Sequence, residues 1–162
     1  MGAGILPIAK HANKLYFLLA LEVSDKKWSD FGGKGNKNES IYETAIREGY
    51  EETNGFFGNK REFKKLVDNN YVLKIDKYNN SYRTYLINIS YDKNLPFYFN
   101  NNAKFINDNF KELIDKNGFF EKKIVKWFSI NELKNNRNYR IFYKEIIDIL
   151  IDNYILIKKL IN

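Results

Sequence analysis

The chain has 162 residues, enough for one domain with a hydrophobic core, and 44% of its residues are apolar. Its net charge of +7 favours a polyanionic partner, and the absence of cysteine excludes a disulfide framework, a thiolate nucleophile and a cysteine-based metal site. Residues 1–10 lack the pattern of a signal peptide, and no stretch is apolar for long enough to span a membrane. We therefore expect a single cytoplasmic domain over residues 1–162.

The N-terminal part of the chain predicts three strands. Ala3 to Lys10 and Leu15 to Val23 are rich in Ile, Leu and aromatic residues, which predicts two strands joined by a turn at residues 11–14. Trp28 to Gly33 predicts a short strand that runs into a loop over residues 34–38.

A helix is expected to follow this loop. Ser40 is a favourable N-cap and Glu43 completes a capping box, while Asn54-Gly55 is a typical C-terminal stop. One stripe of the helix contains two small residues out of three, so we expect it to pack closely against a sheet. The stripe is Ile41, Ala45 and Gly49.

The C-terminal half predicts a hairpin, then helices and a further strand. The hairpin strands are Leu66 to Lys77 and Tyr82 to Tyr91, with a turn at residues 79–80. Residues 100–102 read as a loop, and residues 103–117 as a weakly periodic helix that Gly118 ends. A strand over Ile124 to Ser129, a helical turn over residues 130–133 and a core helix from Tyr139 onward complete the chain.

Three carboxylates on the first predicted helix are the strongest functional signal. Glu48, Glu51 and Glu52 stand at i, i+3 and i+4, so they project from one side of the helix. Two carboxylates ~5 Å apart repel by ~3 kcal/mol at an effective dielectric constant of ~20, which favours a cation between them. Oxygen ligands without sulfur or imidazole indicate Mg²⁺, with Mn²⁺ as a substitute.

Such a cluster is suited to the hydrolysis of a phosphoanhydride bond, in which a carboxylate takes the proton of the attacking water. Arg47 directly precedes the cluster and is able to orient a glutamate through a bidentate pair. Glu39, at the junction between loop and helix, is the expected partner of Arg47.

The pattern resembles the Nudix box: a glycine, five residues, Glu, seven residues, Arg-Glu, an apolar residue, any residue, Glu-Glu, two residues, Gly and an apolar residue. The matching residues are Gly33, Glu39, Arg47, Glu48, Glu51, Glu52, Gly55 and Phe56. Gly49 departs from the pattern, because the family usually carries a larger aliphatic residue there. The box covers about a seventh of the chain, and the order of predicted elements is similar to the family's α/β/α sandwich with a mixed β-sheet.

The resemblance implies a metal-dependent pyrophosphohydrolase. It assigns metal binding to Glu48, Glu51 and Glu52, adds the carbonyl of Gly33 as a further ligand, and leaves open which glutamate is the general base. Many family members also place a glutamate shortly before an aromatic residue that opens a late strand. Glu121 precedes Trp127 by six residues and is therefore a second candidate for metal ligand or base, with a plain surface glutamate as the alternative.

The substrate is less well specified by the sequence. Arg83 is the best candidate for a phosphate contact, with surface pairing as the alternative, and Lys34 and Lys37 flank the glycine loop. Aromatic residues that stack on a base would be Trp127, Phe31 or Tyr85, although core packing is the more frequent role. Tyr71 lies where ADP-ribose enzymes of the family carry a proline, and a tyrosine there is similar to the dinucleoside polyphosphate group.

The substrate classes that remain are a dinucleoside polyphosphate, capped RNA and a diphosphoinositol polyphosphate. All three are highly charged polyanions. A second functional class is a Nudix-fold module that binds a nucleotide without cleaving it. Such modules usually lose carboxylates of the box, whereas this chain keeps all of them. The apolar C-terminal helix also suggests a homodimer surface, which is compatible with enzymatic activity.

Overall fold

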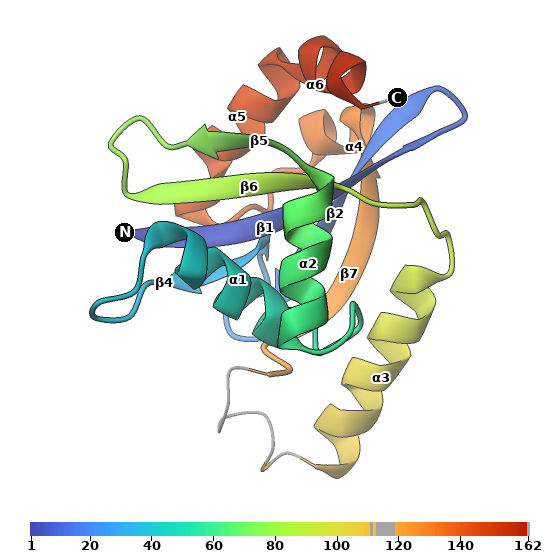
Figure 1. Ribbon diagram of the computed structural model, residues 1–162. Coiled ribbons are helices and arrows are strands. Elements are labelled where there is room, and N and C mark those ends of the chain that lie inside the picture. Colours follow the sequence, from blue (N-terminus) through green and yellow to red (C-terminus); the bar gives the residue numbers. More distant parts are fainter. Residues whose placement is uncertain (111, 113–118, 162) are drawn as a thin grey trace.

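The computed structural model describes residues 1–110, 112 and 119–161 (Figure 1). Its centre is a seven-stranded mixed sheet in the order β3-β2-β1-β6-β5, to which β4 adds beside β1 and β7 beside β2. The strands are β1 (Gly2–His11), β2 (Lys14–Glu22), β3 (Trp28–Ser29), β4 (Phe31–Lys34), β5 (Tyr71–Asp76), β6 (Tyr82–Asn88) and β7 (Lys122–Ser129). Only β1 and β6 pair in parallel among the described strands.

Helices cover both faces of the sheet, as the predicted α/β/α sandwich requires (Figure 1). The helices are α1 (Ile41–Glu52), α2 (Lys60–Asn70), α3 (Leu95–Asn109), α4 (Ile130–Asn135), α5 (Lys144–Asp152) and α6 (Tyr154–Leu160), with a short 3₁₀ helix over Ile141–Tyr143. Three groups of buried apolar side chains join these layers: one beneath α4, α5 and α6, one beneath α1 and α2, and one beneath α3. The predicted fold class is confirmed.

Helix α1 begins and ends as the sequence predicts, and its small stripe packs against the sheet. The hydroxyl of Ser40 accepts from the backbone N–H of Glu43, and the Glu43 carboxylate accepts from the backbone N–H of Ser40. A Cβ added to Gly49 would lie 2.8 Å from Ile5 Cγ1 and 2.9 Å from Phe63 Cζ. The departure from the Nudix box at Gly49 therefore has a packing reason, because Phe63 of α2 fills the space that a larger residue would take.

Two predicted boundaries are wrong, and side-chain hydrogen bonds explain both. Residues 66–70 are helical because Asn59 and Glu62 form a capping box that starts α2, and Phe63 and Val67 bury one face of it. Residues 100–102 lie inside α3, where the Asn100 amide donates to Val125 O at 3.3 Å and accepts from Val125 N at 2.7 Å. The amide thus bonds the backbone of β7 instead of breaking the helix.

Four smaller predictions also change. The strand predicted over Trp28 to Gly33 is two short strands, β3 and β4, and the strand predicted to reach Tyr91 ends at Asn88. The C-terminal helix divides into α5 and α6 at Asn153, whose side chain donates to Ile149 O at 2.9 Å. The predicted helix over residues 103–117 is confirmed only as far as Asn109, and its end at Gly118 lies outside the described residues.

Candidate active site

Arg47 is the centre of an ion-pair network on the outer side of α1. Its Nε and Nη2 donate to the two carboxylate oxygens of Glu39 at 2.9 and 3.0 Å, which confirms the predicted bidentate pair. Nη1 donates to Glu48 at 2.8 Å and to Glu51 at 3.1 Å, and Nη2 also donates to Lys34 O at 3.1 Å. The hydrogen bonds from Arg47 are the main reason that the pKa of Glu39 falls to about 2.

Gly33 of β4 makes room for the Glu48 carboxylate. A Cβ added to Gly33 would lie 2.6 Å from Glu48 Oε2, so any side chain at this position would displace the carboxylate. Burial raises the pKa of Glu48, against the lowering effect of Arg47. The sequence predicts a ligand role for the Gly33 carbonyl, and the structure adds a steric reason for glycine here. That ligand role stays a prediction.

Glu52 points into the protein, whereas Glu48 and Glu51 are partly exposed. Its exposed fraction is 3%, and its Oε1 lies 3.1 Å from Nζ of the fully buried Lys122. Lys122 Nζ also donates to Glu22 Oε2 at 2.8 Å and to Ser29 Oγ at 3.3 Å. Burial raises the pKa of Glu52, while the charge of Lys122 opposes this shift. Burial disfavours the charge on Lys122, but Glu52 and Glu22 outweigh it and raise the pKa of Lys122.

Lys122 and Glu22 are not among the residues predicted from the sequence, although two features of the chain point to them. Each charge stands at one end of an apolar strand, Glu22 at the end of β2 and Lys122 at the start of β7. The two residues are directly opposite each other in the β2–β7 pairing. Neither residue is informative until that pairing is known.

The three box carboxylates suit a divalent cation in their chemistry, but the described side chains are not already gathered around one point. No group of three acidic or histidine side chains among residues 1–110, 112 and 119–161 has the spacing of a metal site. Arg47 holds Glu48 and Glu51, and Lys122 holds one oxygen of Glu52. The other oxygen, Glu52 Oε2, is buried without a hydrogen-bond partner, and its role as a metal ligand stays a prediction.

Glu121 lies at the edge of this cluster, at the start of β7. Its backbone carbonyl accepts from Val23 N at 2.9 Å, and the residue as a whole is exposed, although its carboxyl is partly shielded from solvent. Burial of the carboxyl contributes most to raising the pKa of Glu121, followed by the charges of Glu22 and Glu51. The structure thus places Glu121 within electrostatic reach of Glu51, and its role as ligand or base stays a prediction.

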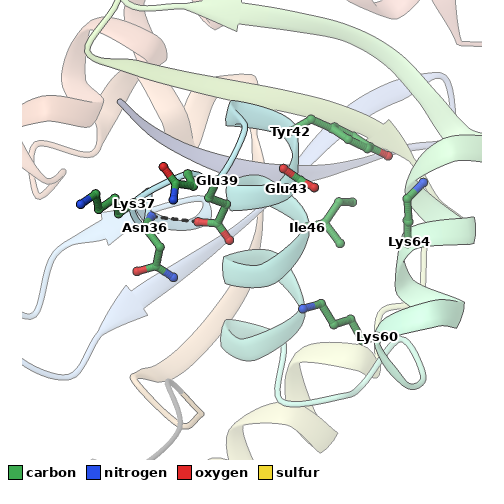
Figure 2. Close-up of a pocket in the computed structure, with 9 residues that line it drawn as sticks. Asn36, Lys37, Glu39, Tyr42, Glu43, Ile46, Lys60 and Lys64 are labelled. Atoms are coloured by element: carbon green, nitrogen blue, oxygen red, sulfur yellow. Dashed lines mark hydrogen bonds between the residues drawn. The ribbon is translucent and has the colours of Figure 1, made fainter.

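The predicted phosphate contacts are dispersed around α1. Arg83 forms a bidentate pair with Asp76 across the β5–β6 hairpin, with Nη2 2.9 Å from Oδ2. Lys37 lines a groove of about 500 Å³ beside the start of α1, where Figure 2 shows it with Tyr42, Lys60 and Lys64. Three lysines and two glutamates, Glu39 and Glu43, line this groove, so its charges are mixed in sign.

The aromatic candidates for base stacking are mostly in the core. Phe31, Tyr85 and Trp127 are 1%, 8% and 6% exposed, and Trp127 Nε1 donates to Asp92 O at 2.8 Å. Tyr71 is different, because it is 49% exposed at the start of β5. Among the aromatic residues singled out in the sequence, Tyr71 is therefore the one with a free face.

The C-terminal helices pack against the sheet through Ile146, Ile147 and Leu150 of α5 and Ile157 of α6. Within the described residues, no helix combines the length and apolar character needed to cross a bilayer. Ile155, Leu156 and Leu160 of α6 remain more than half exposed, at 62%, 53% and 53%. The homodimer surface suggested by the sequence would use this face and stays a prediction.

Known structures resemble this fold, although no protein-family model and no curated protein sequence matches the chain. A binary complex of the C. elegans Ap4A hydrolase matches with a TM-score of 0.57 and 15% identity, over 96% of this chain and 98% of that one. The NUDIX domain of Shewanella oneidensis NrtR, complexed with ADP ribose, matches with a TM-score of 0.52 and 13% identity, over 96% and 85%.

A third match is the bifunctional NMN adenylyltransferase/ADP ribose pyrophosphatase of Francisella tularensis, complexed with AMP and a Mn ion. Its TM-score is 0.52 at 16% identity, and the match covers 93% of this chain and 41% of that longer one. At these identities the likeness establishes the architecture, in agreement with the box from Gly33 to Phe56. The chain therefore has the fold of the Nudix hydrolases, with the complete Nudix box on β4, α1 and the loops beside them.

Proposed function

We propose that the protein is a divalent-metal-dependent hydrolase that cleaves a phosphoanhydride bond in a nucleoside diphosphate-linked or other highly phosphorylated substrate. The observation that carries this proposal is the arrangement of the box on α1. Glu48, Glu51 and Glu52 lie on adjoining faces of one helix turn, and Glu52 keeps a buried oxygen without a partner. This donor set suits Mg²⁺, and Mn²⁺ would substitute for it.

A bound divalent ion would neutralise phosphate charge and lower the pKa of a water molecule. The chain itself supplies orientation. Arg47 holds Glu48 and Glu51 through one nitrogen, so both carboxylates face the same solvent-exposed space. Glu39 fixes Arg47 in turn, through two hydrogen bonds. The residues Glu39 and Arg47 are therefore positioning residues in this proposal, and Gly33 keeps the space that Glu48 needs.

The proton of the attacking water would go to a carboxylate that is not fully committed to the metal. Glu48 and Glu121 are the two candidates in the open part of the cluster, and burial raises the pKa of each. A higher pKa makes a carboxylate a stronger base. Comparison of Glu48→Gln with Glu121→Gln assigns the base, because loss of the base removes the alkaline rise of kcat/KM.

Among substrates, a dinucleoside polyphosphate has the best support. The Ap4A hydrolase matches the fold over nearly the whole of both chains. Tyr71 offers an exposed ring for base stacking. The groove beside the box contributes Lys37 and Lys60, although Glu39 and Glu43 also line it and Lys64 pairs with Asp68. Capped RNA and a diphosphoinositol polyphosphate remain the other candidates for a polyanionic substrate, and a nucleotide sensor without turnover is the non-enzymatic alternative.

A substrate panel with Mg²⁺ tests the proposal. The panel contains diadenosine tetraphosphate, capped RNA, ADP-ribose, oxidised dGTP and a diphosphoinositol polyphosphate. We expect cleavage of at least one substrate and a loss of about a hundredfold or more in Glu52→Gln, because a metal ligand is removed. Glu145→Gln, on the opposite side of the sheet in α5, is the matched control and should keep the parent rate.

Two outcomes would contradict the proposal. Glu52→Gln that cleaves as fast as the parent would exclude the assigned metal site. Tight binding across the panel without turnover, in the presence of Mg²⁺ or Mn²⁺, would favour the sensor.

A further inference from the structure

Lys122 is surrounded by oxygen atoms in the way that a bound cation is. Its side chain is 0% exposed, and its Nζ contacts Glu22 Oε2 at 2.8 Å, Glu52 Oε1 at 3.1 Å and Ser29 Oγ at 3.3 Å. These three oxygens come from β2, α1 and β3, so the fold brings them together from separate elements. A lysine is almost never fully buried unless it is paired, because removing an ammonium from water is costly.

The partners of Lys122 are also suitable ligands for a hard divalent ion. Two carboxylates and a hydroxyl are the oxygen donors that Mg²⁺ and Mn²⁺ accept. An ammonium is a compact point charge with three donors, and it satisfies the same three oxygens here. The position of Nζ is therefore a cation position that the chain fills with one of its own residues.

Glu52 connects this position to the proposed metal site. One of its oxygens is bound by Lys122, and the other, Oε2, is buried without a hydrogen-bond partner. The carboxylate is thus held by one oxygen and offers the other. A buried polar atom without a partner points to a ligand at this carboxylate.

We propose that the Lys122 ammonium occupies a position that a divalent cation would otherwise take, and that it fixes Glu52 as a ligand with one free oxygen. The inference rests on the proposed function, because it concerns the same carboxylate. It makes Lys122 a positioning residue, and it limits the number of metal ions that the cluster binds. Replacement of Lys122 by a small residue should then open a site lined by Glu22, Ser29 and Glu52, in which Arg140 still donates to Glu22 Oε2 at 3.2 Å.

Titration with Mn²⁺ alone, followed by electron paramagnetic resonance and calorimetry, tests this proposal without any substrate. We expect Lys122→Ala to bind one Mn²⁺ more per chain than the parent. Lys122→Met fills the space with an uncharged side chain and should bind the parent number. Lys126→Ala is the matched control, since Lys126 is on the same strand but is half exposed and pairs with Glu132, and it should also bind the parent number.

A double variant identifies the ligands of the extra ion. Lys122→Ala with Glu22→Gln removes one of the two carboxylates, and we expect the extra Mn²⁺ to be lost or to bind at least tenfold more weakly. If Lys122→Ala folds only when Mn²⁺ is present, as judged by circular dichroism, the ion has replaced the ammonium and the proposal is supported. If it stays unfolded with Mn²⁺ while Lys122→Met folds, the three oxygens do not hold a cation and the proposal is overturned.

If Lys122→Ala is folded and binds the same number of Mn²⁺ ions as the parent with the same affinity, the proposal is likewise overturned. The same titration tests the proposed function through a different measurement, the binding of Mn²⁺ to the parent chain. A parent chain that binds no Mn²⁺ would contradict the proposed function, whereas the extra ion in Lys122→Ala depends on Glu22 and Ser29, to which the proposed function assigns no role.

Discussion

Helix α1 takes part in two ion-pair networks that differ in their exposure to solvent. On the outer side, Arg47 is 18% exposed and is shared by three carboxylates that are 14–21% exposed. On the inner side, Lys122 is 0% exposed and binds Glu52 and Glu22, which are 3% and 6% exposed. The outer network is able to rearrange around a ligand at low cost, whereas the inner one is fixed by packing.

This difference separates two tasks within one helix turn. Glu48 and Glu51 face open space and share one guanidinium, so a cation that enters there competes only with Arg47. Glu52 is already bound by the buried Lys122 and does not need to move. From this difference we expect Lys122 to contribute mainly to stability and Arg47 mainly to activity.

Replacing each of the two basic residues by methionine tests this difference, and the change in the free energy of unfolding should be large for one of them. Lys122→Met leaves the buried Glu52 without a cation, while Glu22 keeps Arg140 as a partner at 3.2 Å, and it should lower the free energy of unfolding by about 3–5 kcal/mol. Arg47→Met, at a partly exposed site, should lower it by only about 1 kcal/mol. Urea denaturation of both variants measures the difference. Equal losses would contradict the assignment of separate roles.

Asp30 is a buried carboxylate that is held by hydroxyl groups, whereas Glu22 and Glu52 are held by the ammonium of Lys122. It is 0% exposed and accepts from Tyr82 Oη at 2.7 Å and Thr84 Oγ1 at 2.8 Å. Burial raises the pKa of Asp30 from 3.8 to about 7. The folded protein therefore holds this proton more tightly than the unfolded chain does, and the resulting stability is fully present below pH ~4 and is lost as the pH rises through ~7.

We expect Asp30→Asn to flatten the decline in unfolding free energy between pH 4 and pH 7, a contribution of roughly 4 kcal/mol at 1.36 kcal/mol per pKa unit. Thermal or urea unfolding across this pH range measures it. Asp148→Asn, at an exposed position of α5, is the control and should keep the parent slope. A slope that is unchanged in Asp30→Asn would show that other groups cause the decline.

Arg47 and its control Arg61 test the outer network through activity. Arg47→Ala removes the group that orients Glu48 and Glu51 and should lower kcat roughly 10- to 100-fold, as the loss of a partner that orients metal ligands commonly does. Arg61→Ala changes an exposed arginine of α2 and should leave kcat at the parent value. If the two variants behave alike, Arg47 does not position the carboxylates.

Gly33→Ala tests whether the outer network depends on space as well as charge. The new Cβ would lie 2.6 Å from Glu48 Oε2 and would displace that carboxylate. We expect kcat to fall about tenfold or more, because small displacements of a reacting group are costly, with little change in the melting temperature. Gly55→Ala would not be a suitable control, because Gly55 has a φ of +70°. Gly35→Ala, in the loop that follows β4, would not serve either, because its Cβ would lie 2.9 Å from the carbonyl oxygen of Met1. An unchanged kcat in Gly33→Ala would show that the position of Glu48 does not depend on this space.

Arg83 should give the smallest effect. Its bidentate pair with Asp76 engages the groups that a phosphate would otherwise bind. If Arg83 contacts the substrate, Arg83→Ala should raise KM by up to about tenfold, and Asp76→Asn, which frees the guanidinium, should lower it. Unchanged KM and kcat in both variants would remove Arg83 from the site.

The sequence predicted those parts of the molecule that local rules determine. Ser40 and Glu43 predict the start of α1, and the spacing of the box places Arg47 beside Glu39. The start of α2 was overlooked because Leu66 and Val67 look like strand residues when read without the capping box at Asn59. The apolar pattern at Leu66 and Val67 was misleading, although the capping box that starts α2 is present in the sequence.

Other features depend on contacts between distant segments. Glu22 and Lys122 are 100 residues apart and become neighbours only through the pairing of β2 with β7. The inward direction of Glu52 follows from that pairing, because the lysine that holds it belongs to β7. Spacing along a helix shows that three glutamates share a side, but it does not show which of them the rest of the fold will bury.

Binding of Mn²⁺ to the box glutamates is the most direct test of the proposed metal site. Calorimetry on the parent and on the triple variant Glu48→Gln/Glu51→Gln/Glu52→Gln requires no knowledge of the substrate. We expect at least one Mn²⁺ to bind the parent chain and its affinity to fall more than a hundredfold in the triple variant, in which Lys122 and Arg47 remain. Equal affinity in the two proteins would contradict a metal site on this helix.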